Sequence, residues 1–165
     1  MTRIKSVNFP NTEDEEKGLF DKLQRAAVTA LLNTGALAIS AGTSALAKFA
    51  NTIYFMIDGQ VYSKTTANCA ALAGTVTAAK FNVFVFSVNA AGTLATQMGT
   101  EAATLGGVVF PSVADGYVAI GFVIINPSGT GNFVGGSTPL DDATVIPNAA
   151  YVNTVGDFFP QYSTL

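Results

Sequence analysis

The stretch Lys80-Phe-Asn-Val-Phe-Val-Phe-Ser-Val88 decides the fold, because it predicts a β-strand with two apolar faces. Phe84 and Phe86 fall on one face, and Val83 and Val85 fall on the other. A sheet with one face in water would carry polar residues at every second position. We therefore expect a sandwich interior on one side and a second cover on the other. A helix, another sheet or a neighbouring subunit could provide that cover.

Further strands are predicted on both sides of this one. Asp58-Gly59 separates two β-rich runs, 52–57 and 60–63, and is typical of a two-residue hairpin turn in which both residues take positive φ. Tyr117 to Asn126 is the most apolar strand. Shorter strands are expected at 93–98, at 108–110, around Phe133 and Val145, and at 151–155. The predicted fold class is mainly β: an antiparallel β-sandwich or barrel-like domain.

A helix is predicted before the strands. Thr12 and Glu15 have the spacing of a capping box, and the acidic run 13–16 suits the positive end of the helix dipole. An apolar stripe follows at helical spacing and ends before Asn33-Thr-Gly35; its members are Leu19, Leu23, Ala26, Ala27, Ala30 and Leu31. The expected organisation is an N-terminal arm and helix over residues 1–34, followed by a β-rich domain over residues 35–165.

Charge is scarce and unevenly distributed. Ten of the 19 charged residues (8 Lys and Arg, 11 Asp and Glu) fall within residues 1–25, and the chain has no histidine. A Ser-His-Asp triad is therefore impossible. A glycosidase needs two facing carboxylates, and nothing in the sequence brings any two of Asp58, Glu101 and Asp115 together. We expect no enzymatic activity and no cofactor.

Two classes of partner are disfavoured. A net charge of −3 with scattered lysines argues against nucleic acid, since phosphate binding needs clustered Lys and Arg. The uncharged stretch Ala26–Ala47 approaches the length of a membrane helix, but Asn33-Thr-Gly35 and Ser40-Ala-Gly-Thr-Ser44 interrupt it. Turns explain it better than a membrane span.

Two loops are candidate ligand sites, but each has a simpler structural explanation. Gly129–Gly135 faintly resembles a dinucleotide loop, but its spacing is wrong and no helix is predicted after it, so a loop between strands is the better interpretation. Asp141-Asp142 lacks the alternating spacing of a calcium loop, so a turn or a polar interface contact is favoured. We assign no metal site. The tyrosines could stack on sugars but are more often core or rim residues.

Low charge together with two dry strand faces indicates self-association. The residues expected at an interface between copies are the helical Leu19 and Leu23, the last residue of the helical stripe, Leu31, and the strand residues Phe84 and Phe86.

Four segments carry a resemblance to a known class: 31–39, the hairpin 54–64, Ile120-Gly-Phe-Val-Ile-Ile-Asn-Pro127, and 133–142. Together they resemble small virion structural proteins of tailed bacteriophages, of the capsid decoration (cement) or head-fibre type. The resemblance implies a β-rich domain, often a homotrimer, made in the host cytoplasm. It would sit on the outer capsid surface of the virion, bind the major capsid protein and stabilise the shell.

The placement of charge suggests a division of roles within such a protein. The arm, with Arg3, Ile4, Lys5 and Phe9, together with the helix, would hold the capsid or the trimer axis, and the β-domain would form the exposed knob. The alternative function is a receptor- or glycan-binding knob of a head or tail fibre. A small hydrolase with an unrecognised carboxylate site is a third hypothesis.

Overall fold

The computed structural model describes residues 29–147 and 149–155, which form twelve strands and one 3₁₀ helix. The elements in chain order are β1 (Ala30–Leu31), β2 (Leu37–Ile39), β3 (Ala47–Phe49), β4 (Ile53–Ile57), β5 (Gln60–Lys64), β6 (Ala67–Asn68), β7 (Thr75–Val76), β8 (Asn82–Asn89), β9 (Leu94–Met98), η1 (Leu105–Gly107), β10 (Tyr117–Ile125), β11 (Phe133–Val134) and β12 (Ala150–Asn153).

A four-stranded antiparallel sheet in the order β12-β10-β8-β9 forms the centre of the domain. Its two middle strands, β8 and β10, are the two most apolar predicted strands, and nearly every residue along them is buried. The predicted strands at 80–88, 93–98 and 117–126 are thus confirmed to within two residues at each end. The turn at Asp58-Gly59 is also confirmed, with φ of 51° and 78° between β4 and β5.

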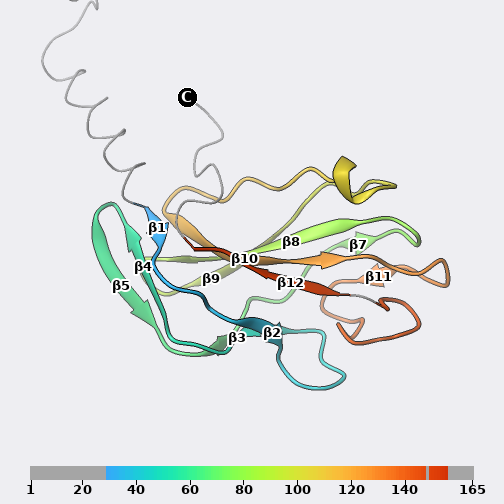
Figure 1. The fold of residues 1–165 in the computed structure, drawn as a ribbon, viewed down its shortest axis with the longest axis horizontal. Coiled ribbons are helices and arrows are strands. Elements are labelled where there is room, and N and C mark those ends of the chain that lie inside the picture. The colour runs from blue at the N-terminus through green and yellow to red at the C-terminus, as the bar shows by residue number, and fades with distance from the viewer. Residues whose placement is uncertain (1–28, 148, 156–165) are drawn as a thin grey trace, which may run out of the picture.

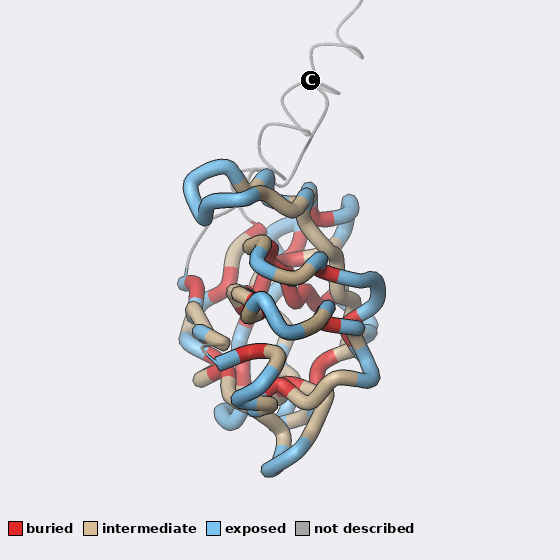
Figure 2. Tube along the Cα trace, turned by 90° about the vertical axis from the view of Figure 1, so that its right-hand side faces the viewer, coloured by how far each residue is buried: buried red, intermediate tan, exposed pale blue. Residues whose placement is uncertain are grey.

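Three small sheets cover one face of the central sheet: β1-β4-β5, β2-β3-β6 and the β7-β11 ribbon. Figure 1 shows β2 to β5 as a layer apart from β8 and β10. The main hydrophobic core includes Phe84 and Phe86 of β8 together with Phe49, Phe55 and Phe133 from the covering sheets. The described strands form open antiparallel sheets and no closed barrel. From the end where β7 and β11 lie, buried segments are surrounded by exposed turns (Figure 2).

The other face of the central sheet is covered by the chain's own connection between β9 and β10, residues 99–116. Val113 of this connection packs with Val83 and Val85 in a second core. The Phe110 ring meets the Phe122 ring of β10 edge-on, with centroids 4.9 Å apart. Figure 1 shows the connection, with η1, on the side of β8 away from β2 and β3. Among the described residues, the second cover is therefore this connection of the same chain.

Backbone pairing holds this connection in place. The Gly99 amide N–H donates to the Val83 carbonyl at 2.9 Å, and Thr100 and Val109 exchange N–H···O bonds of 2.9 and 3.3 Å. Buried Asn82 donates through Nδ2 to the Gly99 carbonyl at 3.1 Å. The predicted strand at 108–110 is reduced to the single bridge between Thr100 and Val109.

The predicted helix needs one correction. Ala30 and Leu31, the last residues of its apolar stripe, form β1 and pair with Met56 and Phe55 of β4. Pairing with β4 and burial of Leu31 in the main core outweigh the modest helix propensity of this short apolar run. β1 thus belongs to a sheet of the β-rich domain. The earlier part of the helix lies outside the described residues.

A bulge in β10 changes which of its residues face each core. The register against β8 shifts between Ala119 and Gly121, so Ile120 faces the main core and Phe122 faces the second core. Gly121 sits at the shift with φ of 155°. A Cβ there would lie 2.4 Å from the Val152 carbonyl oxygen of β12.

Gly121→Ala should therefore destabilise the domain by about 1–3 kcal/mol or more, because the added methyl has no room beside β12. Urea unfolding followed by circular dichroism measures the difference. Gly129→Ala is the matched control, since no atom lies within 4 Å of its added Cβ, and it should stay within about 0.5 kcal/mol of the native chain. Equal stability of the two variants would contradict the bulge geometry.

Candidate functional site

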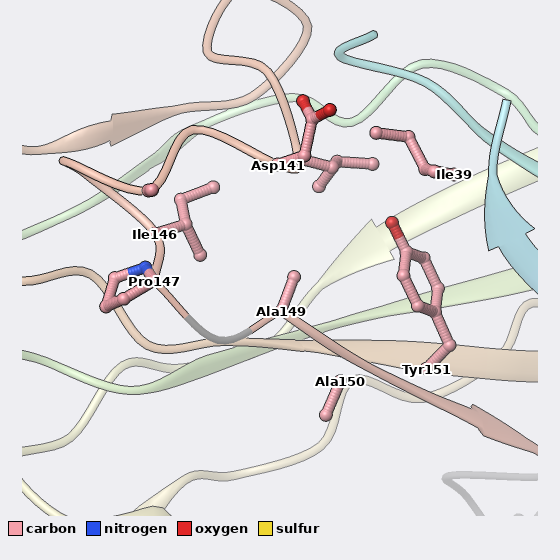
Figure 3. A pocket seen from close by; sticks show the side chains of 9 residues that line it. Ile39, Asp141, Ile146, Pro147, Ala149, Ala150 and Tyr151 are labelled. Atoms are coloured by element: carbon pink, nitrogen blue, oxygen red, sulfur yellow. The ribbon is translucent and has the colours of Figure 1, made fainter. Parts of the chain in front are cut away.

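A hollow in the described surface lies between β2, β12 and the loop that precedes β12, with a volume of about 530 Å³. Its lining is mostly small and apolar, with one carboxylate and one phenol. Figure 3 shows Tyr151 rising from β12 toward the side where Ile39 and Asp141 lie. The lining residues are Ile39, Leu140, Asp141, Ala143, Ile146, Pro147, Ala149, Ala150 and Tyr151.

Asp141 and Asp142 shape the loop on one side of this hollow. Asp141 Oδ2 accepts the Thr43 amide N–H at 2.9 Å and ties the loop to the turn after β2. Asp142 Oδ1 accepts the amide N–H groups of Thr144 and Val145 at 2.9 and 3.1 Å. The pair thus acts as a turn, the interpretation favoured from sequence. The residues described here include no cluster of three or more His, Cys, Asp or Glu able to hold a metal ion.

Tyr151 is the one group in the hollow with an unusual environment. Its hydroxyl is buried and has no hydrogen-bond partner among the described residues. Burial, together with the nearby charge of Asp141, raises its pKa to about 12. The phenol therefore stays protonated at neutral pH and can donate a hydrogen bond, but it cannot act as a base.

Cys69 is equally unsuited to chemistry. It is 5% exposed and forms part of the main core. Burial raises the pKa of its thiol to about 12, although a hydrogen bond from its own backbone acts in the opposite direction. Because the thiolate is the reactive species, this cysteine behaves as a small core residue.

The three carboxylates considered for hydrolysis lie on different segments. Asp58 is in the β4–β5 turn, and Asp115 is exposed just before β10. Glu101, in the connection 99–116, accepts the Thr77 amide N–H at 2.8 Å and forms an ion pair with Lys80 at 3.0 Å. The Thr77 amide lowers the pKa of Glu101 most, followed by Lys80 and the Thr77 hydroxyl, to about 2. Glu101 thus fastens the connection 99–116 to the segment before β8.

Some of the residues predicted to bind partners lie outside the described residues, and the others lie in the core. Arg3, Ile4, Lys5, Phe9, Leu19 and Leu23 lie outside the described residues. The prediction that Leu31, Phe84 and Phe86 form an interface between copies needs correction, because these side chains are 0%, 0% and 1% exposed. They lie in the chain's own core, because the small sheets of the same chain cover the face that the prediction assigned to a neighbouring copy.

The structure also places the glycine-rich stretch, the uncharged stretch and the described tyrosines. The glycine-rich stretch 129–135 is a loop only at its start, because Phe133 and Val134 within it form β11, which pairs with β7. The stretch 30–47 enters β1, β2 and β3. No helix in the described part of the chain is both long and apolar enough to cross a membrane. Tyr54 is the only exposed tyrosine among those described, at 50%.

Sequence reasoning missed two surfaces. The hollow around Tyr151 is lined by residues of β2 and β12, which are distant in sequence, so no local sequence pattern predicts it. The exposed side chains of Leu32, Tyr54 and Val61 share one sheet face. The alternation along β4 could have shown that Tyr54 points away from the core.

Comparisons with protein-family models, curated proteins and solved structures found no match to this chain. Function must therefore be argued from the fold, the surface and the sequence.

The Glu101 contacts make a pH-dependent prediction. A folded-state pKa of about 2, against an ordinary 4.5, gives stability that is present above pH 4.5 and lost as pH falls from 4.5 toward 2. Glu101→Gln should remove this contribution, so its melting temperature should fall less than the native value between pH 5.5 and 2.5. Thermal unfolding across this range measures it. Asp115→Asn, at an exposed carboxylate, should keep the native profile; a Glu101→Gln profile parallel to the native one would contradict the assignment.

Proposed function

We propose that the chain is a non-enzymatic structural protein of a tailed-bacteriophage virion. In this proposal it binds the outer capsid surface as a homotrimer, contacts the major capsid protein and stabilises the shell. The β-rich domain is the exposed knob, and the N-terminal arm with Arg3, Ile4, Lys5 and Phe9 makes the attachment.

The observation that carries the proposal is how the described ionisable groups are used. Glu101, Asp141 and Asp142 accept backbone N–H groups that fasten loops. Cys69 and Tyr151 are held protonated by burial. These side chains serve the fold, which suits a protein whose work is contact rather than chemistry.

The self-contained core supports the role of a displayed knob. Both faces of the central sheet are covered within one chain, by the three small sheets and by the connection 99–116. Such a domain can project from a surface while a separate segment attaches it. If three copies each bind through a short arm, even weak single contacts give tight attachment through avidity.

The basis for a trimer is narrower than the sequence suggested. The two dry faces of β8 no longer argue for a neighbour, since the chain covers both. The trimer proposal now depends on the resemblance to phage decoration proteins and on the low charge content of 12%.

A glycan-binding knob is the second candidate, and the hollow beside β12 favours it. Asp141 offers an exposed carboxylate acceptor beside the Tyr151 side chain within a mostly apolar lining. A few polar groups in an apolar concavity are typical of small-ligand sites. Binding on a glycan array that Asp141→Ala abolishes would favour this candidate.

Capsid binding tests the main proposal. The full chain should co-sediment with parent-phage capsids assembled without it, and deletion of residues 1–11 should remove that binding because the arm is proposed to make the contact. Electron microscopy of the decorated particle should place the added density on the outer surface. An unchanged far-ultraviolet circular dichroism spectrum controls for folding of the shortened chain.

Undiminished binding by the shortened chain would place the contact elsewhere. Absence of the full chain from the outer surface of the particle would contradict the decoration role itself.

A further inference from the structure

One face of the β1-β4-β5 sheet is apolar and uncovered among the described residues. Strand register places two rows across it, one running from Leu32 through Tyr54 to Ser63 and the other from Ala30 through Met56 to Val61. We call these six residues the outer face. The intervening residues point the other way into the main core; they are Leu31, Ile53, Phe55 and Ile57.

The outer face has the character of a contact surface. Leu32 is 45% exposed, Tyr54 50% and Val61 61%. The six residues include no charge and only one hydroxyl side chain besides the tyrosine, that of Ser63. Contiguous exposed apolar side chains of this kind mark places where another segment packs.

The N-terminal segment, with its predicted apolar stripe, joins the domain beside this face. Thr29, directly before β1, is 3% exposed, and its Oγ1 accepts the Asp58 amide N–H at 3.3 Å. The preceding 28 residues therefore join the domain at the β4–β5 turn, at one end of the same sheet. Their sequence predicts a helix whose apolar stripe, Leu19, Leu23, Ala26 and Ala27, stops two residues before Thr29.

We propose that this stripe of the N-terminal segment packs on the outer face of the same chain's β1-β4-β5 sheet. Residues 19–27 as a helix would span about 14 Å. The five residues of β4 provide about 17 Å of strand to receive them. The two residues Val28 and Thr29 match the usual length of about 2–6 residues between a helix and a strand.

The tether is the reason to assign this occupant ahead of a second copy. A segment joined two residues from the sheet has an effective concentration in the millimolar range or above, which a free partner in solution does not reach. Leu19 and Leu23 then belong to an intrachain contact. The arm that precedes the helix is held at a fixed place on the domain.

Cysteine labelling tests the contact on the full chain. Val61→Cys introduces an exposed thiol on the outer face, while the native Cys69 is buried. If the N-terminal segment covers the outer face, the thiol at position 61 should react with a maleimide about tenfold more slowly than the thiol of Thr130→Cys, which lies in an exposed loop. Adding Leu23→Asp should restore fast labelling. Adding Gln24→Asp, which makes the same charge change outside the apolar stripe, should leave the protection in place.

Two results would overturn the proposal. Labelling of Val61→Cys as fast as Thr130→Cys without any second substitution would show that the face is open. Protection that disappears on dilution would assign the face to a second copy, since an intrachain contact does not depend on concentration. The assay uses the chain alone, so its outcome is independent of whether the protein binds a capsid. An unchanged circular dichroism spectrum for each variant keeps a folding defect from being read as exposure.

Discussion

The structure depends on one constraint: β8 and β10 are apolar on both faces, so both faces of the central sheet must be kept from water. The three small sheets shield the face with Phe84 and Phe86, and the connection 99–116 shields the face with Val83 and Val85. Leaving a fully buried Val or Phe side chain exposed costs about 1.5–3 kcal/mol. Several such residues on either face would exceed the total stability of a small domain, commonly about 5–15 kcal/mol.

Several smaller features of the domain follow from this need. The bulge at Gly121 shifts the register of β10, so that Ile120 enters the main core and Phe122 the second core. Glu101 and Asn82 satisfy polar groups where the connection 99–116 meets the start of β8. Asp141 performs a similar task for the loop beside β12. Three of the five described carboxylates, those of Glu101, Asp141 and Asp142, thus accept backbone N–H groups.

Local patterns in the sequence predicted the longer strands well, but the short strands expected at 108–110 and around Val145, and the covers of the central sheet, poorly. The run of apolar, β-prone residues at 80–88 and the Asp-Gly pair at 58–59 are short-range signals, and both predicted the correct elements. The connection 99–116 has little regular structure, so no periodicity marked it as a layer of the core. The predicted helical stripe includes Leu31 because β1 is only two residues long and is defined by pairing with distant Phe55. The hollow beside β12 depends on the same kind of long-range contact.

The most direct test of this account is native-state hydrogen exchange across the connection 99–116. Because it is a permanent layer of the core, the amides of Thr100 and Val109, which bond to each other's carbonyls, should be protected to the same degree as those of β8. The contrary result would be exchange of these two amides as rapid as in exposed loops while β8 stays protected. The connection would then open locally without unfolding of β8, and the second apolar face of the central sheet would need a different cover.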